Sequence, residues 1–590
     1  MADGSRASAA SISNASCKAG AAPSSSERAR RGARRAALVL AIGLVGCTPA
    51  PLAPPAVASE SGSAAGNYLA GRFALERGDL DAAARGLGRA LELTPDDTAL
   101  RRQVFILEVA SGDVAGALPH ARALLAADAG DTSEARLALA VERLRRDGPA
   151  AARDAFAALP DGTLPGLLRP ILVAWAMPGA AAGADHLADS PPRLEQLEGF
   201  HRVSLLDLAD RPEDALAALS ELADEPARMS DRLLVTQARL LARVGDVEAA
   251  RAMLRLGTSG LERAVLVRRA DAALAAGEIP PPLLADGATG VADALFGLGE
   301  VLEAQRRPLN AIFYTRLGLH VDPGHDPGWL ALGRLMLAQE GPAAAVAAFE
   351  RVPAESPWYR TARLEMAEAM AARGAVDEGA AVLRALADAT SADARPLVAL
   401  GDMMRRAERW DEAVDAYGGA LARLQAGGDA EALWRLHYAH GIALERSSRW
   451  PEAETALERA LELEPDQPFI LNYLGYSWVD QGLHLDEAKA MLQKAVELRP
   501  EDGFIVDSLG WAYYRLGEYE KAVTYLERAV SLEPGDPVIN DHLGDAYWRV
   551  GRVREARYQW ERALTLEPEA DEIPEIEAKL ERGLPERDAG

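Results

Sequence analysis

Two histidines at helical spacing are the most metal-like residues of the chain. His437 and His440 lie three positions apart, beside Trp434 and Tyr438, so on a helix both imidazoles would share one side. No carboxylate or third histidine lies at an offset that would complete a ligand set. We therefore interpret the pair as part of helix packing.

Sequence motifs of known enzyme classes are missing. The chain has no Gly-x4-Gly-Lys-Ser/Thr phosphate loop, no His-Glu-x-x-His zinc motif and no Gly-x-Ser-x-Gly nucleophile elbow. Carboxylates are dense in segments such as Glu458 to Glu464, but nothing there indicates a desolvated acid–base pair. The sequence predicts no enzymatic activity, no cofactor, no metal site and no small-molecule substrate.

Composition favours a helical protein that does not bind nucleic acid. The formal net charge is −25, and the arginines alternate with Glu and Asp, whereas nucleic-acid binding calls for a clustered basic face. Aromatic residues make up 5% of the chain, and no alternating run of β-branched residues indicates a sheet. The elements that position any functional side chain are therefore expected to be helices.

The stretch from Pro468 to Pro568 repeats one pattern three times. Each copy has a Leu-Gly pair, at Leu474-Gly475, Leu509-Gly510 and Leu543-Gly544. Small residues and prolines then recur every 34 positions, at Ala488, Ala522 and Ala556, at Ala495, Ala529 and Ala563, and at Pro500, Pro534 and Pro568. A fixed period of this length indicates a repeat architecture, in which small residues let two helices pack closely and proline ends the unit.

This pattern resembles the tetratricopeptide repeat family. The resemblance implies an all-α solenoid, a superhelix of helix-turn-helix units, and its columns can be followed back to Gly71. Prolines and glycines between Ile279 and Gly290 interrupt it, and we place a domain boundary there. The predicted parts are a partly degenerate array at 67–288, a regular array at 289–568, and a capping helix (Ile573 to Arg582) with a tail at 569–590.

The family resemblance also implies where a partner binds. In such arrays the first helix of each unit lines a concave groove that often binds peptides. Counting from the Leu-Gly pairs, the groove-facing residues are Asn472, Tyr476, Asp507, Trp511, Tyr514, Arg515, Asp541, Asp545, Trp548 and Arg549. Aromatic and arginine side chains are common binding anchors. The alternative is that these aromatics only pack one repeat against the next.

The amino-terminal residues have the layout of an export signal. Five arginines between Arg28 and Arg35 precede an apolar run from Ala36 to Val45, which is too short to span a bilayer. Leu44-Val45-Gly46-Cys47 resembles the lipobox of bacterial lipoproteins, which implies removal of residues 1–46 and a lipid on Cys47. In the lipoproteins that this segment resembles, an Asp directly after the cysteine disfavours the outer membrane. Because Thr48 stands there instead, the resemblance implies sorting to the outer membrane. An ordinary signal peptide is the alternative. Residues 48–66 are rich in Pro, Ala and Ser and predict a flexible tether.

These features together predict a non-enzymatic scaffold that binds proteins or peptides. We expect an outer-membrane lipoprotein facing the periplasm, and it resembles the lipoprotein adaptors that bring carboxy-terminal processing proteases to cell-wall hydrolases. Two alternatives remain. The chain is a structural part of an export or assembly machine, of the polysaccharide-secretion or pilus type, or it is a cytoplasmic scaffold whose signal is misread.

Overall fold

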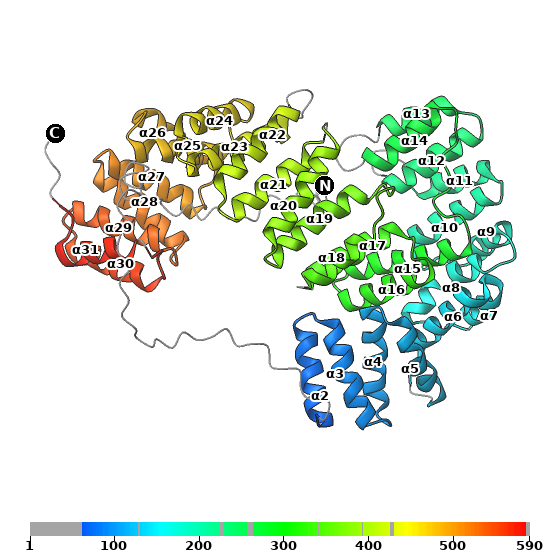
Figure 1. Cartoon of the computed structure of the whole chain (residues 1–590). Coiled ribbons are helices and arrows are strands. Elements are labelled where there is room, and N and C mark those ends of the chain that lie inside the picture. Colours follow the sequence, from blue (N-terminus) through cyan, green and yellow to red (C-terminus); the bar gives the residue numbers. More distant parts are fainter. Residues whose placement is uncertain are drawn as a thin grey trace. The chain divides into compact units, whose positions relative to one another are not determined.

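The structure is an all-α assembly of helix pairs. The computed structural model describes residues 62–585 apart from 128–129, 223–228, 257–263, 340, 392, 425–429 and 571. Over these residues it contains 30 α-helices, α2 to α31, and no strand (Figure 1). This confirms the predicted α-solenoid fold. The predicted signal, Cys47 and the tether up to residue 61 lie outside the described residues.

The chain divides into two compact units between Leu386 and Ala387. The helices of the N-terminal unit are α2 (Ala64–Glu76), α3 (Leu80–Leu93), α4 (Thr98–Ser111), α5 (Val114–Ala126), α6 (Ser133–Asp147), α7 (Pro149–Ala157), α8 (Leu164–Trp175), α9 (Ala180–Asp189), α10 (Glu195–Leu208), α11 (Pro212–Leu222), α12 (Asp231–Arg243), α13 (Val247–Leu256), α14 (Ala264–Ala275), α15 (Gly287–Ala304), α16 (Pro308–Val321), α17 (Asp326–Ala338), α18 (Pro342–Glu350), α19 (Tyr359–Ala372) and α20 (Val376–Ala389), whose last residues cross the division. The helices of the C-terminal unit are α21 (Arg395–Arg406), α22 (Trp410–Leu424), α23 (Ala430–Arg446), α24 (Trp450–Leu463), α25 (Pro468–Gln481), α26 (Leu485–Leu498), α27 (Gly503–Arg515), α28 (Tyr519–Leu532), α29 (Pro537–Arg549), α30 (Val553–Thr565) and α31 (Ile573–Arg582).

Local sequence signals set the helix ends in the C-terminal unit. The Asp536 carboxylate accepts a hydrogen bond from the Ile539 backbone N–H at 3.0 Å and so caps α29, which begins with Pro537. Between α29 and α30 the chain turns at Gly551, whose φ is 80°. Glycine adopts this left-handed conformation without the steric cost of a side chain. Cap, proline and turn glycine therefore mark the α29/α30 pair in the sequence.

The glycine of the Leu-Gly pair brings the two helices of a unit together. A Cβ on Gly510 of α27 would lie 2.7 Å from the Leu526 Cγ of α28, and one on Gly544 would lie 2.5 Å from the Trp560 Cδ1. Leu526 and Trp560 are fully buried. Any larger residue at these positions has to push the helices apart.

We therefore expect Gly510→Ala to destabilise the C-terminal unit by about 1–3 kcal/mol, because overpacking outweighs the better helix propensity of alanine. Urea denaturation followed by circular dichroism measures the change. Gly535→Ala is the matched control, because no atom lies within 4 Å of a Cβ there. Equal stability of the two variants would contradict this account of the Leu-Gly pair.

The N-terminal unit closes on itself through α15 and α16. Helix α16 packs against α4 and α6, and α15 packs against α8 (Figure 1). The Arg316 Nε of α16 donates a hydrogen bond to the Ala110 carbonyl at the end of α4, at 3.2 Å across 206 residues of sequence. The predicted division at 288/289 falls at the start of α15. The compact units divide at 386/387 instead, because α15 and α16 belong to the packed interior formed with α4, α6 and α8.

A buried polar cluster ties four helices of this unit together. Asp293 of α15 is 1% exposed, and its carboxylate lies 2.6 Å from the Arg232 Nη2 of α12 and 3.2 Å from the His325 Nε2 before α17. The His201 Nε2 of α10 lies 3.7 Å from the same carboxylate. The Trp175 Nε1 donates a hydrogen bond to the His201 Nδ1 at 3.0 Å, which leaves the Nε2 to carry the proton.

Burial and charge set the protonation of this cluster. Burial alone would raise the pKa of Asp293, but Arg232 and His325 outweigh it and hold the pKa of the carboxyl below its usual range. Burial lowers the pKa of His201 to about 4, so its imidazole is neutral near pH 7. The charged pair of the cluster is therefore Asp293 with Arg232.

The lowered pKa of His201 predicts that the N-terminal unit is less stable in acid. Between pH 6.5 and 4 the unfolded chain binds a proton on His201 that the folded chain does not, so stability falls as the pH falls through this window. Urea midpoints measured from pH 7 to 4 should decline less steeply in His201→Gln. The same decline in both proteins would show that His201 does not cause it.

Candidate protein-binding face

All ten predicted groove residues lie on the first helices of three consecutive pairs, α25/α26, α27/α28 and α29/α30. Helix α25 carries Asn472 and Tyr476, and the other eight residues lie on α27 and α29. Each first helix packs against the second helix of the preceding pair, as α27 does on α26 and α29 on α28. The stacking therefore brings these side chains into neighbouring positions.

Several of these side chains join one repeat to the next. The Asp507 carboxylate of α27 lies 3.0 Å from the His542 Nδ1 of α29. The Tyr514 hydroxyl accepts from the Arg549 Nε at 3.3 Å. Partners on α27 and α29 are 35 residues apart, because they occupy matching positions one repeat away. For these residues the contacts are those of inter-repeat packing, the alternative left open by the sequence.

Arg515 makes the corresponding contact with the preceding repeat. Its Nη1 lies 3.3 Å from the Asp480 carboxylate of α25, and its Nη2 donates to the Asp480 backbone carbonyl at 3.0 Å. Burial raises the pKa of Asp480, and Arg515 opposes that rise. The arginine therefore fixes the end of α25 to α27.

Trp511 lies between two other rings. Its indole stacks on Tyr514 with centroids 4.7 Å apart and on His542 with centroids 4.1 Å apart, both nearly parallel. His542 is buried; although burial lowers its pKa, Asp507 outweighs this and raises the pKa above its usual value. A protonated imidazole over an indole gains from a cation–π contact. Trp511 is nevertheless only half-buried.

Helix α31 covers the predicted residues of α29. The Lys579 Nζ lies 2.5 Å from the Asp541 carboxylate and 2.9 Å from that of Asp545. A Cβ on Gly583 would lie 1.9 Å from Trp548, and the Arg549 Nη1 donates to the Pro585 carbonyl at 2.8 Å. Asp541, Asp545, Trp548 and Arg549 therefore contact the chain's own carboxy-terminal segment.

Asp545 has the perturbed carboxyl under α31. Burial and the neighbouring Asp541 raise the pKa of Asp545 to about 6, and Lys579 opposes that rise. The Trp560 Nε1 donates to the Asp545 Oδ1 at 2.9 Å. Lys579 is thus the cation that holds two carboxylates together at the end of the array.

Three predicted residues remain as a candidate contact surface, which we call the α25–α27 face: Asn472, Tyr476 and Trp511. All three side chains are partly exposed. The Asn472 Oδ1 is buried and has no hydrogen-bond partner among the described residues. Burial raises the pKa of Tyr476, so its hydroxyl stays protonated and able to donate. Two rings and an amide can hold an apolar side chain and hydrogen-bond to a peptide backbone.

Two residues that shape this region were not predicted as site residues. His542 stacks on Trp511, and Lys579 forms ion pairs with Asp541 and Asp545 of α29. The sequence carried a signal for Lys579, because it lies 34 positions after Asp545 and so occupies the matching position one repeat on. His542 precedes the glycine of its Leu-Gly pair by two residues, a position that faces the preceding repeat.

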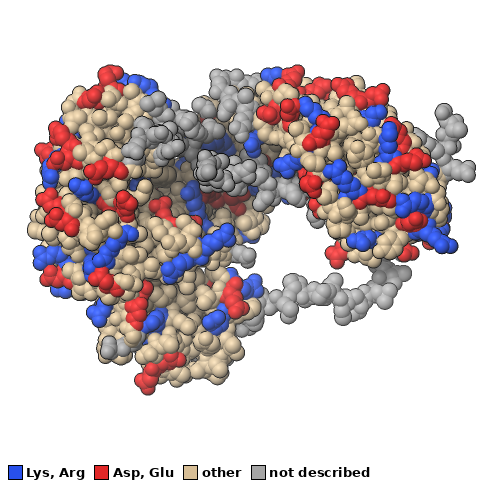
Figure 2. All heavy atoms as spheres, turned by 180° about the vertical axis from the view of Figure 1, so that it is seen from behind, with Lys and Arg blue, Asp and Glu red and all other residues tan. Residues whose placement is uncertain are grey.

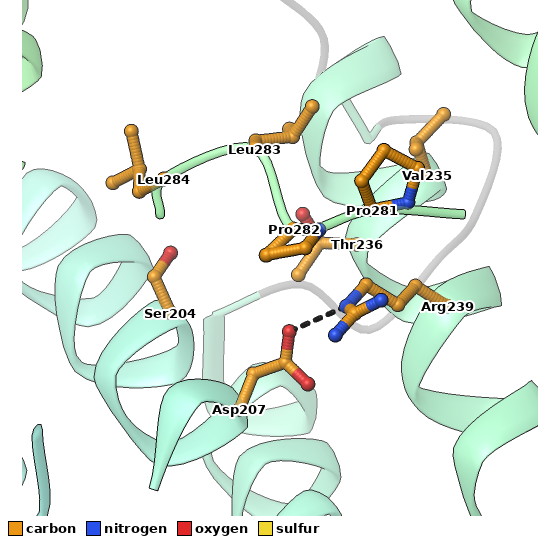
Figure 3. Close-up of a pocket in the computed structure, with 9 residues that line it drawn as sticks. All are labelled: Ser204, Asp207, Val235, Thr236, Arg239, Pro281, Pro282, Leu283 and Leu284. Carbon is orange, nitrogen blue, oxygen red and sulfur yellow. Dashed lines mark hydrogen bonds and ion pairs between the residues drawn. The ribbon is translucent and has the colours of Figure 1, made fainter. Parts of the chain in front are cut away.

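The cavity in Figure 3 is closed by the chain itself. It lies between α10, α12 and the proline segment that begins at Pro280, and at about 10 Å³ it holds roughly one water molecule. The Arg239 Nε donates to the Asp207 carboxylate at 2.7 Å, and its Nη1 donates to the Pro280 carbonyl. These contacts fix the proline segment across the two helices and leave no room for a ligand.

A larger cavity of about 250 Å³ lies elsewhere in the N-terminal unit. It is lined by Val265, Arg268, Arg269, Ala354, Ser356, Pro357, Tyr359 and Arg360.

Acidic and basic side chains are interspersed over the face shown in Figure 2. This distribution is that of a solvated surface.

The described residues contain no group of three or more side chains that could hold a metal ion. The histidine pair lies on α23, where burial lowers the pKa of His440 to about 4. No described helix is long and apolar enough to cross a membrane.

Stacked helix pairs joined at matching positions define a helical-repeat scaffold. Tetratricopeptide repeat models match residues 393–466, 438–503 and 507–536, so this part of the chain consists of tetratricopeptide repeats. No curated protein matches the sequence.

Solved structures of this repeat class align with parts of the chain. A tetratricopeptide repeat protein from Parabacteroides merdae is 12% identical, with 43% of this chain and 97% of that one covered and a TM-score of 0.36. YrrB, described as a TPR protein with an unusual peptide-binding site, is 18% identical, with coverage of 33% and 97% and a TM-score of 0.27. MamA from AMB-1 is 26% identical, with coverage of 28% and 94% and a TM-score of 0.24.

Proposed function

We propose that the chain is a non-enzymatic scaffold that binds a peptide segment of a partner protein on the α25–α27 face. The observation that carries the proposal is the combination of the half-buried Trp511 with the unpartnered Asn472 Oδ1. A buried carbonyl oxygen without a donor is costly, and rotation of the partly exposed Asn472 side chain on binding would let a peptide N–H satisfy it. The tetratricopeptide repeats at this face support a protein partner.

Capture of partners by the immobilised chain from solubilised cell envelopes tests the proposal. We expect the variant Tyr476→Arg to lose at least one partner that the unaltered chain retains, while its helical signal stays unchanged. Phe469→Ala is the control, since Phe469 is an exposed aromatic residue of α25 outside the face. Retention of every captured protein by Tyr476→Arg would place binding elsewhere.

We further propose that Cys47 carries a lipid and holds the chain at the outer membrane, facing the periplasm. The support is the arginine-rich segment, the short apolar run and the lipobox-like residues before Cys47. Labelled palmitate should enter the protein and its Cys17→Ala variant, but not Cys47→Ala. Incorporation into none of them would favour an ordinary signal peptide or the cytoplasmic alternative.

The partner class that this placement favours is a periplasmic protease together with cell-wall hydrolases. Proteins captured in the experiment above should then include such enzymes. Stoichiometric recovery with an outer-membrane pore would instead support a structural role in an export or assembly machine.

A further inference from the structure

The first helix of the array presents an apolar face that the described residues leave open. In α2 only Asn67 and Gly71 are buried, whereas Leu69 is 66% exposed and Phe73 is 53% exposed. Isolated exposed apolar residues are common on proteins. These two, however, lie one helical turn apart on the same side of α2, and the repeat pattern explains what this side is for.

Gly71 occupies the same position as the glycines of the carboxy-terminal repeats. A Cβ on Gly71 would lie 2.8 Å from the Leu87 Cγ, and one on Gly510 would lie 2.7 Å from the Leu526 Cγ, each leucine following 16 residues later. Residues two positions before and after the glycine can therefore be compared between repeats.

At these two offsets the counterparts in the last two helix pairs are buried, and around Gly510 they are Ser508 and Ala512. Around Gly544 they are His542, 5% exposed, and Ala546, 0% exposed, and His542 contacts Trp511 of the preceding pair. Around Gly475 the counterparts Tyr473 and Ser477 are half-buried. Leu69 and Phe73 thus occupy an inter-repeat interface, but no described repeat precedes them. The apolar face of α2 is one half of a helix–helix interface.

The residues before α2 do not have the composition to supply the missing half. Residues 48–61 are rich in Pro, Ala and Ser and lack helical periodicity, and residues 1–46 have the layout of a signal that is removed. The other end of the array does not fit either. Helix α31 exposes mainly charged residues, namely Glu575, Glu577, Glu581 and Arg582, beside one large apolar residue, Ile573, and such a surface is a poor cover for Leu69 and Phe73. Head-to-tail stacking of copies is therefore disfavoured.

The face is complementary to itself. Gly66, Leu69, Ala70 and Phe73 follow the i, i+3, i+4, i+7 spacing of one helix stripe, and all four are exposed. In an antiparallel pair of α2 helices related by a two-fold axis, the small residues of one helix receive the large residues of the other, with Leu69 against Phe73 of the second copy. Two-fold dimers with identical surfaces are the commonest homo-oligomers.

We infer that two copies of the chain associate through this face of α2 as a two-fold dimer. The association does not depend on peptide binding at the α25–α27 face. It places the two polypeptides with their α2 helices antiparallel, so that the two copies of Ala64 lie at opposite ends of the contact.

Light scattering measured on the full-length protein as it elutes from a sizing column tests the inference. The protein is applied at about 50 µM, because dimers of micromolar affinity persist at this concentration. The expected mass is twice the 62.7 kDa of one chain. Leu69→Asp with Phe73→Asp should raise the dissociation constant about 100-fold or more, because charges replace the apolar contacts. Leu498→Asp is the control at a leucine that is 44% exposed outside the face, and it should leave the dimer intact. The helical circular dichroism signals of the Leu69→Asp/Phe73→Asp variant and of the Leu498→Asp control should match that of the unaltered chain.

A cross-link reports the geometry directly. In a chain with Cys17 and Cys47 replaced by Ser, Ala70→Cys should be joined to its counterpart by a short bismaleimide, and Leu498→Cys should not. A monomeric unaltered chain, or a dimer that survives Leu69→Asp with Phe73→Asp, would overturn the inference.

Discussion

Substitution of Asp293 by Asn is expected to destabilise the N-terminal unit by about 3 kcal/mol. The change keeps the shape of the side chain but removes the charge that faces Arg232, His325 and His201. Removing one partner of a buried ion pair leaves the other charge uncompensated, at a typical cost of about 3–5 kcal/mol. The lower figure applies because the Arg232 side chain is 24% exposed and keeps some hydration.

Hydrogen exchange measured by mass spectrometry locates the effect. Exchange should accelerate in α10, α12 and α15, which meet at Asp293, and should be unchanged in α27 to α30. Asp154→Asn is the matched control, since Asp154 is 85% exposed and pairs only with its neighbour Arg153. A surface pair of this kind contributes little, about 0–1 kcal/mol. Equal effects of both substitutions would show that the buried cluster is not specifically stabilising.

Removal of the Lys579 amine is the second large effect we expect. In Lys579→Ala the Asp541 and Asp545 carboxylates face each other without a cation, and α31 should detach from α29 and expose Trp548. We expect a loss of about 3 kcal/mol or more from the C-terminal unit at pH 8. Tryptophan fluorescence during urea denaturation measures it, because Trp548 and Trp560 lie at this contact.

This loss should shrink at low pH. The pKa of Asp545 is already raised to about 6, so the folded state takes up a proton between the ordinary value near 3.8 and pH 6 that the unfolded chain does not. The stability that this proton provides is complete below about pH 3.8 and is lost as the pH rises through 6. Without Lys579 the carboxyl is harder still to ionise, so Lys579→Ala should be less damaging at pH 5 than at pH 8.

Two further variants separate charge from packing at this site. Asp545→Asn combined with Lys579→Met removes the lysine and one of the two carboxylates that it faces, and should recover part of the stability, because Asp541 then no longer faces a second negative charge. Lys494→Ala removes an exposed lysine that pairs with Asp466 at the surface, and should have little effect at either pH. A pH-independent loss in Lys579→Ala would contradict the role of the acidic pair.

The helical-repeat fold was predictable because its signals are local. The glycine of each Leu-Gly pair reflects one close contact, such as Gly510 with Leu526, that recurs at Gly475 with Leu492 and at Gly441 with Leu457. The fold-back of the N-terminal unit was not predictable in this way. The contact between Arg316 and Ala110 joins segments 206 residues apart, and neither segment carries a periodic sign of the other.

The helices that carry the candidate site residues were predictable from the sequence, but the contact partners of those side chains were not. Counting from the Leu-Gly pairs selected residues that lie on α25, α27 and α29, yet several of those side chains contact the next repeat. Asp507 has His542 as its partner and Asp545 has Lys579. A position in the repeat gives the direction of a side chain, whereas its partner depends on the residue 34 or 35 positions further on. At Asn472 the Oδ1 remains without a hydrogen-bond partner among the described residues.

The closure of the N-terminal unit by α15 and α16 has a consequence for the order of events during synthesis. Phe105 of α4 packs edge to face on Phe313 of α16, with ring centroids 5.8 Å apart, so the interior between them is incomplete until residue 321 has left the ribosome. Contacts of the C-terminal unit form between neighbouring repeats and need only short loops to close. The N-terminal unit is made first, but it has the longer wait between the synthesis of its first helices and the completion of its interior. We expect α4, α6 and α8 to need protection from aggregation during that interval.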